Sequence, residues 1–288
     1  REVVALKNSG TFKKVVVILN TPNDIWFDVL FDYKDDIDSC MWVCSTGFEG
    51  LDEVGRILVG ESVPSGHLVD TFLQNTRSNP VFANTLANTY SNANSMPLTN
   101  LGYQGTYITY AEGIYLGYKY YETRYEDSVM GRGNATSTTG AVNSASNWVY
   151  GEEVAFPFGY GLSYTSFDYS DVKLSYDAAT TTYTMKVTVT NTGDVAGKET
   201  VQIYVSSPYT EYDKENKVEK ASVSLVGFEK TDILEPGKSE TLTIEVDGDY
   251  VASYDAYGAG TYILDAGDYY FTAATDAHNA ANNVLAAK

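Results

Sequence analysis

Three ionisable side chains stand where acid–base chemistry is conceivable, and each also has a structural explanation. Glu49 lies at an expected helix start, where the helix dipole and unpaired N–H groups stabilise a carboxylate and lower its pKa, which is unsuitable for a general acid. Glu112 lies among tyrosines, which favours a buried, hydrogen-bonded carboxylate that orders Tyr110 and Tyr115. His67 follows a Pro-Ser-Gly turn, which favours a surface or interdomain position. The structural interpretation is preferred for each, with a functional role as the alternative, so we assign no catalytic residue.

The cysteines and histidines indicate neither a metal site nor a disulfide. Cys40 and Cys44 lie in one apolar run, and in a strand they would be about 13 Å apart at ~3.3 Å per residue. A disulfide needs Cα atoms within about 7 Å, so we predict two buried, reduced thiols. His67 and His278 are the only histidines, and each is isolated. The sequence also has no GxSxG segment and no phosphate-binding loop, and we predict no metal and no cofactor.

Length and charge limit the class of protein. The 288 residues suffice for two domains, each with a sizeable core. The net charge of -19 would repel nucleic acid and anionic membrane surfaces, whereas a neutral sugar would be indifferent to it. No apolar run approaches the roughly 20 residues of a membrane span. We therefore expect no nucleic-acid partner and no membrane insertion.

The first part of the chain alternates strand and helix patterns. Lys14–Asn20 predicts a buried parallel strand, Asp28–Tyr33 a short helix, and Ile37–Cys44 the next strand. A helix should follow from Gly47 to Leu58 and stop at Gly60. This order is typical of a parallel sheet with helices, which is an α/β architecture.

Two polar stretches, Asn75–Gly105 and Arg124–Glu153, predict long loops. They are either surface decoration or, as the alternative, a cover over an active site that another domain supplies. Asn134-Ala135-Thr136 is a glycosylation sequon, which matters only in a eukaryotic secretory context.

After residue 167 the pattern is strand and turn. Residues 182–190 alternate, which places Tyr183, Met185, Val187 and Val189 on one face. Further strands are expected at 200–205, 223–228, 241–246 and 267–273, with a charged loop at 211–220. About seven short strands without a cysteine pair favour an all-β sandwich of the fibronectin III kind.

The segment Phe156–Phe167, FPFGYGLSYTSF, separates the two patterns. Pro157 excludes a helix, Gly159 and Gly161 permit dihedrals closed to other residues, and the aromatic rings bury a large area. We interpret the segment as a rigid aromatic linker clamped between two domains, with a sugar-stacking platform as the alternative.

Three segments in order resemble glycoside hydrolase family 3 of the β-glucosidase type. They are Tyr110–Thr123 (YAEGIYLGYKYYET), Phe156–Phe167, and Val187–Glu199 (VTVTNTGDVAGKE). The resemblance implies the later part of an α/β sandwich domain at 1–155, the linker at 156–167, a fibronectin-III-like domain at 168–274 and an exit segment at 275–288. It also implies a retaining enzyme that hydrolyses terminal β-glycosidic bonds of a β-glucoside or oligosaccharide.

The catalytic residues of that family are not found in this chain. Its nucleophile is an aspartate of an SDW-like motif in a TIM-barrel domain, and no Ser-Asp-Trp occurs here. Its acid/base glutamate lies upstream of the strand that matches Lys14–Asn20. The resemblance therefore implies a TIM-barrel partner domain in the same protein, and a role for this chain in bracing the barrel and walling the sugar site. The isolated chain should be inactive.

Two other classes of protein stay open, a carbohydrate-binding protein and a structural or adhesion module. The 25 tyrosines favour the former, because aromatic rings stack on sugars. The tail Thr275–Lys288 resembles the exit segment of family members in which the barrel follows the sandwich domains. Its residues Ala277, Ala281, Val284 and Leu285 recur at helical spacing, so the tail could form a helix that docks on a neighbour. An ordinary C-terminal helix is the alternative explanation of this tail.

Overall fold

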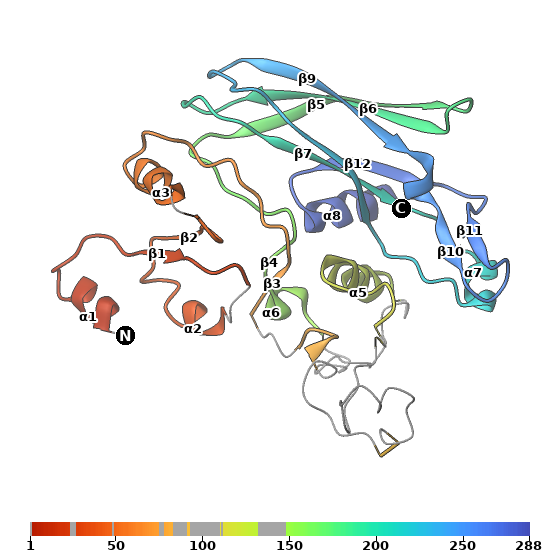
Figure 1. The fold of residues 1–288 in the computed structure, drawn as a ribbon, viewed down its shortest axis with the longest axis horizontal. Coiled ribbons are helices and arrows are strands. Elements are labelled where there is room, and N and C mark those ends of the chain that lie inside the picture. Colours follow the sequence, from red (N-terminus) through yellow and green to blue (C-terminus); the bar gives the residue numbers. More distant parts are fainter. Residues whose placement is uncertain are drawn as a thin grey trace.

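The computed structural model describes residues 2–23, 27–47, 49–74, 78–82, 91–92, 110, 112–131 and 148–288. Figure 1 shows a β-sandwich at the top, a small α/β part at the lower left, and the helices α5 and α8 between them. The predicted fold class, α/β followed by a β-sandwich, is confirmed. No helix within the described ranges is long and apolar enough to cross a membrane.

The α/β part begins with alternating helices and strands. Its elements are α1 (Glu2–Asn8), β1 (Val16–Leu19), α2 (Asp28–Phe31), β2 (Ser39–Trp42) and α3 (Gly50–Leu58). Strands β1 and β2 pair in parallel with Val16 opposite Ser39, as predicted from the β-branched run. Helix α3 ends as expected, before Gly60, which has a φ of 79°.

Two predictions for this sheet are wrong. Val16 and Ile18 of β1 are exposed, because in the described part of the chain the sheet consists of β1 and β2 and leaves these side chains uncovered. Cys40 is exposed and Cys44 is half-buried, although both thiols are free. Strand β2 ends at Trp42 and Cys44 has a φ of 53°, so the alternation that would place both cysteines on one face is broken.

The prediction of a loop at Arg124–Glu153 is also wrong, because both ends of this range are helical. Helix α5 (Tyr118–Met130) runs through its start and ends at Gly131 in the left-handed conformation, and α6 (Tyr150–Glu153) forms its end. Residues 132–147, with the sequon, lie outside the described residues, as does most of 75–105. Strands β3 (Phe72–Leu73) and β4 (Val154–Phe156) pair antiparallel and lead into the linker.

The sandwich consists of two antiparallel sheets of three strands, in the orders β5-β6-β9 and β12-β7-β8. The strands are β5 (Phe167–Asp177), β6 (Thr182–Asn191), β7 (Thr200–Ser206), β8 (Ser224–Lys230), β9 (Ser239–Asp247) and β12 (Tyr270–Ala274). Met185, Val187 and Val189 of β6 are buried in the core between the sheets, and Tyr183 packs partly against it. The predicted inward face of β6 is therefore confirmed.

Smaller elements connect these strands. Helix α7 (Glu211–Asn216) replaces the predicted charged loop, because Thr210 and Asp213 form a capping box at its start. The 3₁₀ helix η4 (Gly248–Val251) precedes a hairpin of β10 (Ser253–Asp255) and β11 (Thr261–Ile263).

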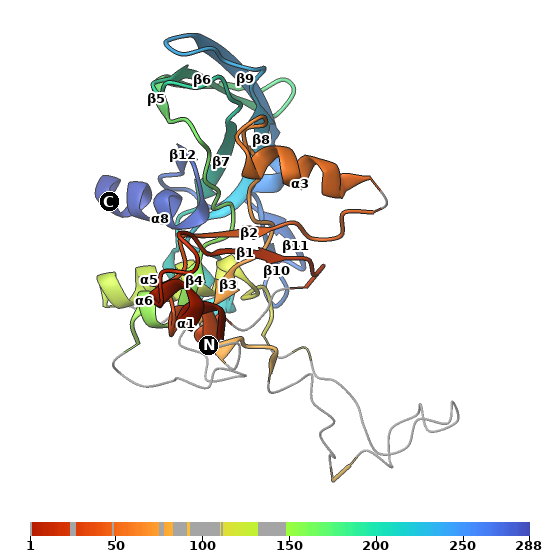
Figure 2. The same ribbon diagram turned by 90° about the vertical axis from the view of Figure 1, so that its left-hand side faces the viewer.

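The tail forms α8 (Ala277–Ala287), which Asp276 caps through the N–H group of Asn279. Both views place α8 between the β12-β7 sheet and α5 (Figures 1 and 2). Ala277, Ala281 and Val284 are buried there, as is Ala280, whereas Leu285 is only half-buried. The expected docking of the tail is confirmed, with the sandwich and α5 as its neighbours.

Candidate functional site at the domain junction

Both domains form hydrogen bonds with the backbone of Gly159, at the centre of the linker. The Gly159 N–H group donates to the Leu68 carbonyl at 2.8 Å, and its carbonyl accepts from Gln202 Nε2 at 3.0 Å. His67 Nδ1 also donates to the Gly159 carbonyl at 2.7 Å, which confirms the interdomain alternative for His67. Gly159 has a φ of 84°, and a Cβ atom there would collide with the Gln202 side chain. Only glycine fits this position without strain.

Aromatic rings join the linker to both domains. Phe158 stacks on Tyr118 of α5 with ring centroids 4.6 Å apart, and Tyr118 meets Tyr204 of β7 edge-on. The Tyr118 hydroxyl accepts from the Leu225 N–H group at 3.0 Å. The Phe158 carbonyl accepts from the first residue of α8, Ala277, at 2.9 Å. The rigid linker interpretation is thus supported by contacts of the linker with α5, β7 and α8.

A buried carboxylate lies between α5, α6 and α8. Glu122 has no exposed surface, and it accepts from Tyr150 at 2.5 Å and pairs with His278 Nδ1 at 2.9 Å. The Tyr150 and His278 rings stack at 3.9 Å. Burial raises the pKa of Glu122, and the hydrogen bonds from His278 and Tyr150 oppose that shift. The tail is thereby tied to the first domain through a polar contact.

A second buried carboxylate faces His67 from the sandwich. Glu199 accepts from the Tyr169 hydroxyl at 2.9 Å and lies 3.9 Å from His67 Nε2. Burial raises the pKa of Glu199, and the hydrogen bond from Tyr169 opposes the shift. His67 therefore connects the linker carbonyl with a sandwich carboxylate.

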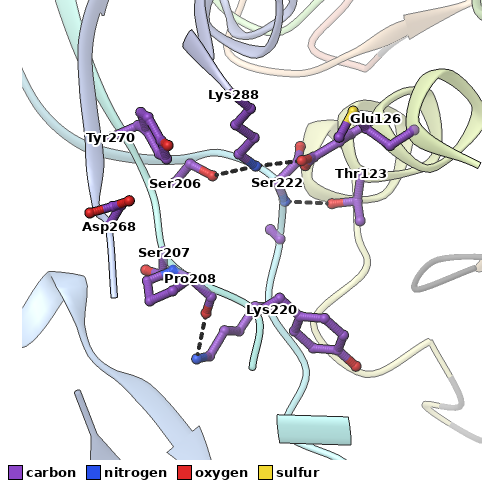
Figure 3. A pocket seen from close by; sticks show the side chains of 13 residues that line it. Thr123, Glu126, Ser206, Ser207, Pro208, Lys220, Ser222, Asp268, Tyr270 and Lys288 are labelled. Carbon is purple, nitrogen blue, oxygen red and sulfur yellow. Dashed lines mark hydrogen bonds and ion pairs between the residues drawn. The ribbon is translucent and has the colours of Figure 1, made fainter. Parts of the chain in front are cut away.

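A cleft of about 360 Å³ opens beside this junction (Figure 3). Two ammonium groups line it, and both are fully engaged. Lys220 Nζ donates to Asp213 at 2.9 Å, to Asp265 at 2.5 Å and to the Pro208 carbonyl at 2.9 Å. Lys288 Nζ contacts Glu126 at 2.5 Å, Ser206 at 3.3 Å and the face of the Tyr270 ring, at 5.9 Å from its centroid.

This arrangement favours structural stability over catalysis. The three N–H bonds of the Lys220 ammonium group are all used in hydrogen bonds. The ammonium group bridges the Asp213 and Asp265 carboxylates, and its positive charge offsets their two negative charges. Lys220 is therefore unsuitable as a free nucleophile or base. Among the residues that the structure describes, no group of three His, Cys, Asp or Glu side chains could hold a metal ion.

Two of the residues considered from the sequence differ from expectation. Glu49 caps α3 only through its backbone position, since its exposed side chain makes no capping hydrogen bond. Glu112 is buried as expected, but its Oε2 atom has no partner in the described part of the chain. Tyr110 points into solvent, and the Tyr115 hydroxyl donates to the Lys220 carbonyl at 3.4 Å. Glu112 therefore does not order these two tyrosines through its carboxylate.

The junction residues Glu122, Tyr150, Gln202 and His278 were not identified from the sequence. Glu122 and His278 are 156 residues apart, so no local pattern joins them. The available signal was the position of Glu122 within the YKYYET segment, which resembles a family signature.

Two family models match the chain. Residues 2–118 match the glycosyl hydrolase family 3 C-terminal domain, and residues 199–277 match the fibronectin type III-like domain. The second match covers β7 to the start of α8, and the first ends at Tyr118, where α5 begins.

Known proteins are similar along almost the whole chain. A β-glucosidase of Ruminococcus albus is 32% identical over 284 residues, which are 97% of this chain and 24% of that protein. β-Glucosidase A of Butyrivibrio fibrisolvens is 32% identical over 277 residues, 90% of this chain and 28% of that protein. The crystal structure of a β-glucosidase from Paenibacillus barengoltzii has a TM-score of 0.72 and 30% identity, and covers 96% of this chain and 26% of that one. The chain thus spans about a quarter of the length of these relatives.

Proposed function

The chain belongs to glycoside hydrolase family 3, and on that premise we propose that it forms the C-terminal α/β part and the fibronectin-III-like domain of a β-glucosidase. The enzyme hydrolyses terminal β-glycosidic bonds with retention, through a covalent glycosyl-enzyme. The observation that carries this proposal is the similarity to the Ruminococcus albus β-glucosidase, which runs through both domains and the linker between them.

The catalytic carboxylates come from outside this chain in the proposed enzyme. A TIM-barrel domain of the same protein supplies the nucleophile, and this chain braces that barrel and walls one side of the sugar site. Exposed apolar side chains on α1, β1 and the end of α3 support the proposal, because a large apolar surface favours burial against another part of the protein. They include Val3, Leu6, Val16, Ile18 and Val59.

The junction gives the bracing role a physical basis. A wall of a substrate site must be held within a fraction of an ångström to contribute to catalysis. The Gln202–Gly159 hydrogen bond, the Phe158–Tyr118 stack and the Glu122–His278 pair fix the α/β part against the sandwich. The sandwich therefore holds the α/β part, and any loop that extends from it, in a fixed position.

The test compares the full-length protein with the isolated chain on an aryl β-glucoside. The full-length protein should release β-glucose first, as NMR of the fresh product can show, because the mechanism retains configuration. The isolated chain should show no turnover. The matched control is a full-length variant in which asparagine replaces the aspartate of the SDW-like motif, and it should also be inactive. Turnover by the isolated chain that Glu112→Gln abolishes would contradict the proposal.

We also propose that the barrel follows this chain in the gene. The support is the resemblance of Thr275–Lys288 to the exit segment of family members with that domain order. Reading the gene should reveal an SDW-like motif downstream of Lys288 and the acid/base glutamate before Arg1. A barrel encoded upstream would contradict this order and leave the family assignment intact.

A further inference from the structure

An exposed aromatic pair lies on the β10–β11 hairpin, at the end of the sandwich near α7 (Figure 1). Tyr254 and Tyr262 are directly opposite each other in the antiparallel ladder, so both rings lie on one face. Their centroids are 5.2 Å apart and the rings meet edge-on at 67°. The two residues are 52% and 67% exposed, and Tyr257, at the turn, is 77% exposed.

The turn between the two strands is held rigidly by Asp255. The buried Asp255 carboxylate accepts from the N–H groups of Tyr257, Gly258 and Ala259 at 3.2, 2.7 and 2.6 Å. It also accepts from the Tyr212 hydroxyl of α7 at 2.6 Å, and that hydrogen bond is the main cause that lowers the pKa of Asp255 to about 2. A ligand that meets these rings orders little of the protein, which reduces the entropic cost of binding.

The hydroxyl groups above this turn are free. In the part of the chain that the structure describes, no hydrogen bond engages the hydroxyl of Tyr254, Tyr257 or Tyr262. Each ring therefore offers an apolar face together with an unused donor and acceptor. These two features match a sugar, which presents C–H faces and hydroxyl groups.

The charge around the hairpin limits the ligand further. Residues 247–268 contain five aspartates and no lysine or arginine. One of the five, Asp265, is paired with Lys220. Nucleic acid, anionic membranes and acidic polysaccharides would be repelled. A neutral glycan has no such penalty.

We propose that the tyrosine pair Tyr254–Tyr262, with Tyr257 beside it, binds a neutral β-glucan chain at the surface of the β10–β11 hairpin. The choice of a glucan rests on the proposed function, whereas the binding surface rests on the hairpin geometry. Such a surface would hold the enzyme near a polymer whose ends it hydrolyses, and the affinity of the two sites together would exceed that of either one.

Affinity electrophoresis of the full-length protein in native gels with soluble mixed-linkage β-glucan tests the proposal. Saturating glucose in the gel occupies the active site, so that any retardation reports a second site. The wild type should be retarded, and Tyr254→Ala/Tyr262→Ala should bind about tenfold more weakly. Tyr254→Phe/Tyr262→Phe should keep most of the affinity, because the rings remain. Tyr176→Ala, at an exposed tyrosine of β5, is the matched control and should bind as the wild type does.

A second measurement needs no variant. Nitration of exposed tyrosines, mapped by mass spectrometry, should slow at Tyr254 and Tyr262 when β-glucan is present and stay unchanged at Tyr176. A wild type that is not retarded, equal retardation of the double alanine variant, or equal nitration with and without glucan would each overturn the proposal. Activity on an aryl glucoside, measured on the same preparations, tests the proposed function separately. If the protein is active but not retarded, only the proposed glucan binding at the tyrosine pair is refuted. If it is retarded but inactive, only the proposed β-glucosidase function is refuted.

Discussion

Gly159 lies between the two domains and forms hydrogen bonds with both. An alanine there would have to adopt a φ of 84° and would displace the Gln202 side chain, whose amide donates to the Gly159 carbonyl. We expect Gly159→Ala to lower the free energy of unfolding by about 3 kcal/mol, from left-handed strain and overpacking together. Urea unfolding measures the difference.

Gly237→Ala is the matched control for Gly159→Ala. Gly237 has a φ of 72°, but nothing lies within 4 Å of the position that a Cβ atom would take, so the substitution adds strain without a collision. It should cost about 1 kcal/mol. Equal losses in the two variants would show that contact with Gln202 contributes nothing.

The buried Glu122 carboxylate predicts a pH dependence of stability. Burial raises its pKa in the folded state above the ordinary value of about 4.3, so the folded protein holds this proton more tightly than the unfolded chain. The resulting stability is complete below the unfolded pKa and is lost as the pH rises through the raised folded pKa. The slope approaches about 1.4 kcal/mol per pH unit between the two values.

Urea unfolding at a series of pH values, with Glu122→Gln beside the wild type, checks this dependence. The variant should show a smaller decrease of stability with pH, although not a flat profile, because Glu199 also has a raised pKa. Glu53→Gln, at an exposed position of α3, should leave the profile unchanged. A variant profile with the slope of the wild type would mean that Glu122 does not titrate in this way.

Helix α8 depends on small side chains for its docking against the sandwich. Ala277, Ala280 and Ala281 are buried against Tyr204 and Val223 of the sandwich. Ala280→Leu should therefore lower the free energy of unfolding by about 1–3 kcal/mol through overpacking. Ala286→Leu, on the exposed side of the same helix, should change it by less than about 0.5 kcal/mol. Thermal or urea unfolding distinguishes the two, and equal effects would show that α8 is not packed as described.

Local patterns predicted an element when its buried face was apolar. Strand β6 was found because the buried Met185, Val187 and Val189 alternate with polar residues that are half-buried or exposed. Helix α5 was not predicted, and its second half was taken for a loop, because its buried side chains include Glu122, Arg124 and Glu126, so it has no apolar stripe to detect. These charges are buried only because other elements cover them, which no local pattern reveals.

Helix α7 was not predicted for a different reason. Its six residues are mostly charged, which suggested a loop. The capping box of Thr210 and Asp213 was a usable signal, because a threonine followed three residues later by an acidic residue marks a helix start. The burial of Asp213 under Lys220 adds a contact from outside the helix.

In the molecule as a whole, the sequence predicted an α/β part followed by a β-sandwich, but not the contacts that join them. His67, which was expected at the surface or between the domains, contacts Gly159 of the linker and lies near Glu199 of the sandwich, and both partners are far away in the chain. The Glu122–His278 pair likewise depends on α8 folding back onto α5. Such contacts arise from the packing of finished elements, so they become visible only in three dimensions.

These contacts predict that the two domains unfold as one cooperative unit. All three tryptophans precede residue 156, so tryptophan fluorescence reports only on the first domain. Hydrogen exchange of β6 and β9 peptides, followed by mass spectrometry, reports on the sandwich. Both signals should change at the same urea concentration in the wild type, because coincident transitions are the mark of a single unit.

Tyr118→Ala should separate the two transitions. The substitution removes the ring that stacks on Phe158 and the hydroxyl that accepts from Leu225, and it leaves both domain cores intact. Leu242→Ala, in the core of the sandwich, is the matched control. It should lower both midpoints together, because the loss of about 2–5 kcal/mol from one core is then shared by a coupled molecule. Two outcomes would show that the junction does not couple the domains. One is a wild type that already shows two transitions, and the other is a Tyr118→Ala variant whose transitions stay coincident. In either case the proposed bracing of a catalytic barrel by the sandwich loses its physical basis.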